Sequence, residues 1–190
     1  MTMRMTTLRW TLALTGLCLL ASPPAVRAED AKTVDVGGLT FATPSSWKSS
    51  PPASSMRRAQ LKIEPASGDT EPAEMIVFAF PGGAGGVEAN VARWEKTFKD
   101  KDGNSPKADV KKVKGQNTDA TRVEISGHYY PTTFPGQPKQ ADHEGYRLLG
   151  AIVTTPETGY FLRLVGPEKT VNAAKADFDK LIASLKVDGK

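Results

Sequence analysis

The sequence contains two histidines, and imidazole is the commonest metal ligand in proteins and titrates near neutral pH. His128 and His143 flank a loop expected over 131–145, and Glu144 adds a carboxylate beside His143. Two imidazoles and a carboxylate can bind zinc or iron, so a metal-dependent hydrolase is one hypothesis. The spacing matches neither H-x-H nor H-E-x-x-H. Two partly exposed histidines beside a loop explain the pattern more simply, and we predict no cofactor.

Glycines form a second cluster with possible chemistry, at Gly82, Gly83, Gly85 and Gly86. Backbone N–H groups at the start of a helix attract anions, and this stretch precedes an expected helix. A phosphate-binding loop needs a lysine directly after its last glycine, and a dinucleotide fingerprint needs a glycine where Glu88 stands. The simpler interpretation is a flexible strand-to-helix connection, with ligand binding as the weaker alternative.

Aromatic residues surround the loop over 131–145, which contains three prolines and two glycines and has no periodicity. Loops longer than about 12 residues are often functional. We therefore predict that Tyr129, Tyr130, Phe134 and His143 bind a partner protein or a small ligand. No G-x-S-x-G nucleophile elbow occurs in the sequence, and we predict that the protein is not an enzyme.

Residues 1–28 have the pattern of a removable secretion signal. Arg4 and Arg9 precede an uncharged, largely apolar stretch over 10–20, and Val26-Arg27-Ala28 places small residues before a cut after Ala28. The apolar stretch is about 11 residues long, whereas a membrane-spanning helix needs about 20. We predict export to the periplasm or the cell exterior, with membrane contact only through this segment before cleavage.

Charge and cysteine content change once residues 1–28 are set aside. That segment holds Cys18, the single cysteine, and three of the 25 basic residues, which leaves 22 basic against 21 acidic residues over 29–190. Leu17 directly before Cys18 argues against attachment of lipid at this cysteine. A disulfide scaffold and a thiol enzyme are excluded for the remaining chain. Its near-neutral charge gives little attraction to phosphates, so we predict no nucleic-acid partner.

The hydrophobic pattern of 29–190 alternates between strands and two helices. Residues 29–38 are polar and are expected to form a loose arm, while Trp47 fits either the edge of the core or a groove. Strands are expected at 39–41, 57–63, 74–80, 110–114, 120–127, 146–154 and 160–165. One helical stripe comprises Val87, Val91, Trp94 and Phe98, and a second, starting at Pro167, comprises Val171, Ala174, Phe178, Leu181 and Leu185.

Most connections between the expected strands are short, which favours antiparallel pairing. Several strands are apolar on both faces and need cover on both sides of the sheet. The sequence therefore predicts one α+β domain over 29–190, with a mainly antiparallel sheet of about six to seven strands and a helix on each face.

Three segments carry a resemblance to a known family: FPGGAGGVEANVARWEKTF (80–98), YRLLGAIVTTPETGYFLRLVGPEKTV (146–171) and FDKLIASLK (178–186). They resemble a group of secreted bacterial proteins of unknown function with a Mog1/PsbP-like α/β/α sandwich, over residues 36–187. Mog1 relatives bind a small GTPase, which conflicts with export, and PsbP relatives assist photosystem assembly. No functional motif of either group is matched here. The resemblance implies the fold, and an assembly factor for an envelope complex is a third hypothesis.

Overall fold

The centre of the fold is an eight-stranded antiparallel sheet in the computed structural model, which describes residues 31–132 and 140–189. The strand order is β3-β4-β5-β10-β9-β8-β6, with β7 also paired to β8. Its strands are β3 (Lys48–Ser49), β4 (Arg57–Ile63), β5 (Ala73–Pro81), β6 (Phe98–Lys99), β7 (Asp109–Lys114), β8 (Asp119–Tyr129), β9 (His143–Thr154) and β10 (Thr158–Pro167). A second sheet contains β1 (Lys32–Asp35), β2 (Leu39–Thr43) and β11 (Lys186–Val187). The two helices are α1 (Gly86–Glu95) and α2 (Glu168–Ser184).

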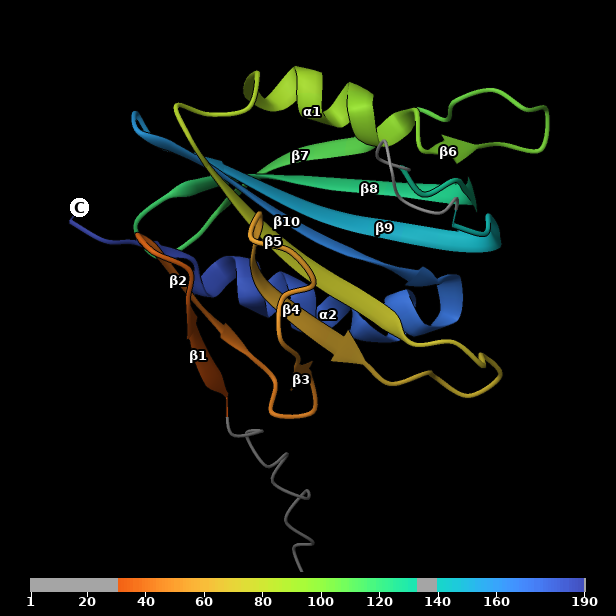
Figure 1. The fold of residues 1–190 in the computed structure, drawn as a ribbon, viewed down its shortest axis with the longest axis horizontal. Helices are drawn as coiled ribbons and strands as arrows, with labels where there is room; N and C mark the ends of the chain where they lie inside the picture. The colour runs from red at the N-terminus through yellow and green to blue at the C-terminus, as the bar shows by residue number, and fades with distance from the viewer. Residues whose placement is uncertain (1–30, 133–139, 190) are drawn as a thin grey trace, which may run out of the picture.

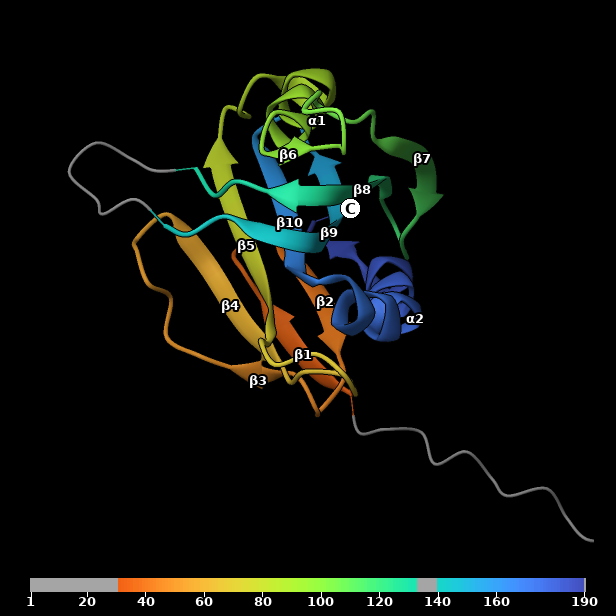
Figure 2. The same ribbon diagram turned by 90° about the vertical axis from the view of Figure 1, so that its right-hand side faces the viewer.

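One helix covers each face of the large sheet, because its central strands are apolar on both sides. Along β9, Leu149, Ala151 and Val153 belong to the core beneath α2, whereas Leu148 and Ile152 belong to the core beneath α1. The small sheet lies on the α2 side, where β2 contacts α2. Figures 1 and 2 show α1 and α2 on opposite sides of the sheet. The predicted antiparallel sheet with a helix on each face is therefore confirmed.

The number of strands exceeds the predicted six to seven. The long strands lie where the sequence places them, including the hairpin of β7 and β8. The additional strands β3, β6 and β11 have two residues each. Strand β1 lies within 29–38, so the prediction of a loose arm there is wrong. Its four residues are mostly exposed, and it is a strand because it pairs with β2.

Helix α1 is shorter than its predicted stripe. Trp94 is buried against the sheet, whereas Val87 and Val91 are half-buried. The helix ends at Glu95, and Phe98 is buried in β6 instead of on the helix. The chain turns after α1 and brings Phe98 into the same core as Trp94. The sequence therefore predicts the burial of Phe98 correctly but places it on a helix instead of on strand β6.

Helix α2 buries the predicted stripe Val171, Ala174, Phe178 and Leu181, and Leu185 is buried directly after its last turn. Pro167 is the residue before the helix and the last residue of β10, so it does not open the helix as expected. Trp47 is 3% exposed and belongs to the core beneath α2, so it is a core residue and does not line a groove.

Two predicted features, cleavage after Ala28 and the binding residue Phe134, lie outside the described residues. Among the helices that the structure describes, none is long and apolar enough to cross a membrane.

Candidate functional site

The structure places the two predicted groups of site residues at opposite ends of the large sheet. Gly83 lies beside Gly159, near the start of β10. Tyr146 pairs with Pro167, at the end of β10. Because β10 has 10 residues at about 3.3 Å each, about 25–30 Å separates the two ends. The glycines and the aromatic residues therefore do not form one site.

The glycine stretch is a connection whose backbone requires glycine. Gly82, Gly83, Gly85 and Gly86 have φ angles of 74°, 78°, 88° and 79°, in the left-handed region that favours glycine. The buried side-chain amide of Asn90 donates hydrogen bonds to the carbonyl oxygens of Ala84 (2.8 Å) and Gly86 (2.6 Å). These bonds fix the loop on the first turn of α1, so backbone shape accounts for the glycines.

Three rings stack at the other end of the sheet, where β8 ends and β9 begins. Tyr129 lies opposite His143 in the strand register, and Tyr146 follows on the same strand as His143. Ring centroids are 4.5 Å apart for His143 and Tyr146 and 6.0 Å apart for Tyr129 and Tyr146. We call Tyr129, His143 and Tyr146 the aromatic column. A β-bulge between Gly127 and Tyr129 shifts the register here and re-aims the side chains that follow it.

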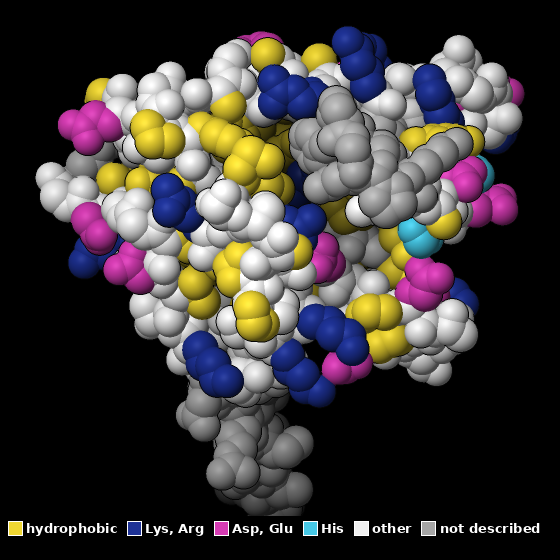
Figure 3. Space-filling model, viewed as in Figure 1, with side chains coloured by type: hydrophobic (Ala, Val, Ile, Leu, Met, Phe, Trp, Pro, Cys, Tyr) yellow, Lys and Arg dark blue, Asp and Glu magenta, His cyan; other side chains and the backbone are white. Residues whose placement is uncertain are grey.

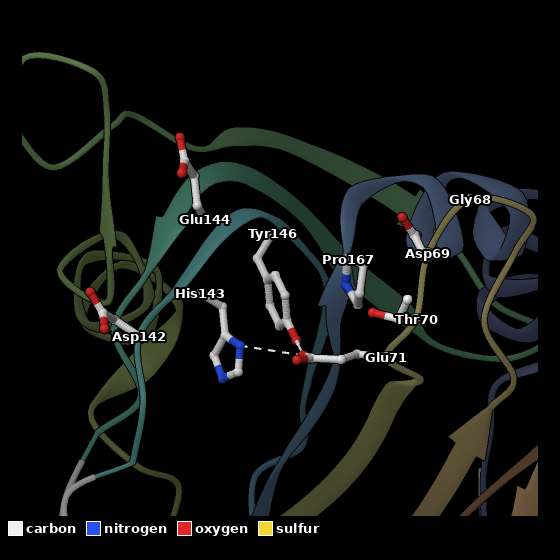
Figure 4. Close-up of a pocket in the computed structure, with 9 residues that line it drawn as sticks. All are labelled: Gly68, Asp69, Thr70, Glu71, Asp142, His143, Glu144, Tyr146 and Pro167. Atoms are coloured by element: carbon white, nitrogen blue, oxygen red, sulfur yellow. Dashed lines mark hydrogen bonds and ion pairs between the residues drawn. The ribbon is translucent and has the colours of Figure 1, made fainter.

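The carboxylate of Glu71 contacts two rings of the aromatic column, Tyr146 and His143. The Tyr146 hydroxyl donates a hydrogen bond to Glu71, and His143 Nδ1 lies 3.4 Å from Glu71 Oε2. Figure 4 shows these side chains converging, while Asp142 and Glu144 point away from Glu71. Glu71, His143 and Tyr146, together with Asp142 and Glu144, line a cavity of about 340 Å³ between β9 and the loop before β5. Burial and the neighbouring Glu71 carboxylate raise the pKa of Tyr146, so its hydroxyl stays neutral and acts as a hydrogen-bond donor.

The loop that carries Glu71 is anchored on the start of α2. Pro167, directly before this helix, has no side-chain acceptor for the free N–H groups of the first turn. Asp69 supplies one, because its Oδ2 accepts from the backbone N (2.8 Å) and the Oγ1 (2.7 Å) of Thr170. Thr170 Oγ1 in turn accepts from the backbone N of Ala66 at 3.0 Å. The cap of α2 thus holds Glu71 over Tyr146.

Replacing Asp69 by alanine is expected to lower the free energy of unfolding by about 1–2 kcal/mol, the usual cost of a lost N-terminal cap. The midpoint of thermal unfolding checks this, with Asp102→Ala, in an exposed turn, as the control. An unchanged midpoint in Asp69→Ala would show that solvent replaces the cap.

The two histidines have separate partners. His128 Nε2 lies 2.9 Å from Asp142 Oδ2, and its ring stacks on Tyr130 with centroids 4.6 Å apart. His143 instead contacts Glu71 and Tyr146. In the described parts of the chain, no group of three His, Cys, Asp or Glu side chains is placed to hold a metal ion. The metal hypothesis on His128, His143 and Glu144 therefore gains no support from the geometry.

Sequence reasoning missed three residues of this region: Glu71, Tyr146 and Arg163. Arg163 is half-buried in β10, and its Nη2 donates a hydrogen bond to the Tyr129 hydroxyl at 3.1 Å, across the intervening strand β9. The signal for Arg163 was available, because it is the single charge in the apolar run 160–165. Glu71 carries no such signal, since only the capping of α2 by Asp69 brings it to the column.

The antiparallel sheet with one helix on each face defines a PsbP-like fold. The solution structure of cyanobacterial PsbP (CyanoP) from Synechocystis sp. PCC 6803 is similar over 88% of this chain and 98% of that one, with 14% identity and a TM-score of 0.51. A protein from Bacteroides thetaiotaomicron matches 85% of the chain with 15% identity and a TM-score of 0.47, and this chain spans half of its length. No family model matches the sequence, and no curated protein matches it. These likenesses concern the fold alone.

Proposed function

We propose that this protein is an exported, non-catalytic binding domain, and that a partner protein or small ligand of the cell envelope contacts it at the aromatic column and Tyr130. The observation that carries the proposal is the concentration of rings at one end of the sheet. His143 keeps 29% of its side chain exposed and Tyr130 is 41% exposed, beside the buried Tyr129. Tyrosine is enriched in binding interfaces because its ring gives a large contact area with little loss of conformational entropy.

The arrangement of the polar groups supports binding over catalysis. Each histidine is already held by a carboxylate and a stacked tyrosine, which fixes its position. The raised pKa of Tyr146 keeps its hydroxyl protonated as a donor, so almost no phenolate is present to act as a base. Such a site offers preformed ring faces and fixed hydrogen-bonding groups, the features of a recognition surface. Export is proposed from the signal pattern of residues 1–28.

The double variant Tyr130→Ala/His143→Ala is expected to fold like the wild type and to lose most of its cross-linked partner. Both side chains are partly exposed, so their removal leaves the core intact. Cross-linking in whole cells followed by mass spectrometry of envelope fractions measures partner recovery. Val110→Ala is the matched control, because Val110 is 46% exposed on β7, away from the aromatic column. Equal recovery from the wild type and the double variant would rule out this site.

A second form of the proposal makes the protein an assembly factor for an envelope complex. The PsbP-like fold is the observation that favours it. The same cross-linking experiment separates the two forms. Several subunits of one membrane complex among the cross-linked products would support the assembly role, whereas one soluble protein would support a simple binding domain.

A further inference from the structure

We propose that Arg163 anchors the carboxylate of a small aromatic acid that lies along the α1 face of the large sheet. The inference rests on the proposed binding function and names the chemical class of the ligand. Side chains of β5 and β10 form this part of the face, next to the aromatic column. Arg163 lies in the middle of this part of the face.

Arg163 is a half-buried cation without a counter-charge. Its one hydrogen-bond partner among the described residues is the neutral Tyr129 hydroxyl, and it forms no ion pair with any of them. Its Nε is buried and finds no acceptor in the described part of the chain; Arg122 and Arg147 each have one such nitrogen too, so the missing ion pair is what distinguishes Arg163. The undescribed segment 133–139 contains no Asp or Glu. Burying a charge without a partner is unfavourable, so a residue kept in this state points to a ligand that supplies the charge.

Two other arginines of the large sheet, Arg122 and Arg147, form ion pairs with carboxylates of the protein. Arg122 binds Asp179 at 2.7 Å and Glu124 at 3.0 Å. Arg147 binds Glu124 and Glu168. All three carboxylates belong to the protein itself, on β8 and α2. On the α1 face, no carboxylate of residues 31–132 or 140–189 forms an ion pair with Arg163.

The surroundings of Arg163 are apolar. Its cross-strand neighbours are Ile76 on β5 and Gly150 on β9, and Phe161 precedes it on the same face of β10. Phe78 and Phe80 continue this face, with parallel rings 6.1 Å apart, and both remain partly exposed. Figure 3 shows hydrophobic side chains gathered on this side of the molecule, below α1.

Glu74 is the acidic residue of β5 that shares this face, and it is already engaged. Its carboxylate accepts a hydrogen bond from Gln60 Nε2 at 2.6 Å and lies 3.7 Å from Arg57 Nη1. Lys62, opposite Glu74 in the register, lies 3.6 Å from Glu64. Around this face the cations Arg57, Lys62 and Arg163 outnumber the carboxylates Glu64 and Glu74, so the local charge is positive, which suits an anion.

The chemistry of the anchor selects a carboxylate with an apolar body. A guanidinium binds a carboxylate through two parallel hydrogen bonds, and such bonds are strongest where water is largely excluded. Because the Tyr129 hydroxyl accepts its bond from Arg163, its own proton can be donated to a carboxylate oxygen. Phe78 and Phe80 provide faces on which an aromatic body can stack.

The test compares 2-naphthylacetate with 2-naphthylacetamide, which share the same body and differ in charge. Isothermal titration of the purified protein is expected to show that the acid binds at least about tenfold more tightly than the amide. In Arg163→Met this ratio is expected to fall to about one, with a thermal midpoint equal to or above that of the wild type. Lys62→Met, which removes an exposed cation of the same face, is expected to keep the ratio.

Equal binding of the acid and the amide to the wild type overturns the inference, as does an absence of binding by both. A large fall in the thermal midpoint of Arg163→Met also overturns it, because Arg163 would then be a structural residue. None of these results affects the proposed function, since partner recovery is tested with Tyr130 and His143 variants that leave Arg163 in place.

Discussion

Replacing Glu124 by glutamine is expected to lower the free energy of unfolding by about 3–4 kcal/mol, the largest effect of any substitution considered for this protein. Glu124, on β8, is 13% exposed and faces Lys175 of α2. It accepts hydrogen bonds from Lys175 Nζ at 2.9 and 3.1 Å, from Arg122 Nη1 at 3.0 Å, and from Arg147. Removing its charge leaves three cations with too few acceptors.

The pH dependence of stability provides an independent measurement of the same network. Burial by itself would raise the pKa of Glu124, but Lys175 and Arg122 outweigh burial and hold the pKa at about 2, below the ordinary 4.5. A carboxylate with a lowered pKa in the folded state stabilises the protein above its unfolded pKa. This contribution is fully present above about pH 4.5 and is lost as the pH falls toward 2.

Urea unfolding at pH 7 and pH 3 checks both expectations. The wild type is expected to lose more stability between these pH values than Glu124→Gln, because the variant no longer has this carboxylate to protonate. Glu64→Gln is the matched control: Glu64 pairs with Lys48 and Lys62, but it is 48% exposed, so its removal is expected to change stability little. Equal losses in Glu124→Gln and Glu64→Gln would show that the buried network does not stabilise the fold.

Replacing Gly150 by alanine is expected to cost about 2–3 kcal/mol, because α1 packs directly on this glycine. A Cβ at position 150 would overlap the ring of Trp94 and lie 3.0 Å from its Cη2. Trp94 is 4% exposed and belongs to the core beneath α1. The added methyl group must therefore push α1 away from the sheet or force Trp94 out of its rotamer.

A double-mutant cycle with Trp94→Phe tests this explanation of the Gly150 effect. The smaller phenylalanine ring leaves room for the alanine methyl group, so the double variant is expected to be about 1 kcal/mol more stable than the sum of the two single effects predicts. Chemical denaturation of the four proteins gives the coupling energy. Additive costs would mean that Gly150→Ala acts through strand β9 itself and not through its contact with α1.

The sequence predicts the long elements of this fold because their periodicity is local. The strand at 57–63 alternates, the strand at 74–80 is apolar throughout, and the stripe that begins at Val171 has helical spacing. Strand β1 escapes prediction because its residues are polar and exposed, and only pairing with β2 orders them. The helical spacing of four apolar residues predicts Phe98 on a helix, although the helix ends at Glu95.

The candidate site was predictable in part. Tyr129 and His143 stack on each other because β8 and β9 pair beside their loop, whereas Tyr130 stacks on His128 instead. The glycine stretch lies at the other end of the sheet, and nothing in its spacing from the tyrosines shows this. Glu71 depends on a contact between Asp69 and Thr170, which are 101 positions apart. Such long-range contacts leave no local pattern in a single sequence.

The position of β10 has a consequence for how the chain acquires its structure. Strand β10 lies between β5 and β9 at the centre of the large sheet, yet it follows every other strand of that sheet in the sequence. During synthesis, the apolar strands β5 and β9 are therefore made before the strand that pairs with both. Pairing across such a long intervening segment is slow, since the loop between the partners must close first. The protein gains its central strand only after every other strand of the large sheet has been made, and until then those hydrophobic strands are exposed to association with other chains.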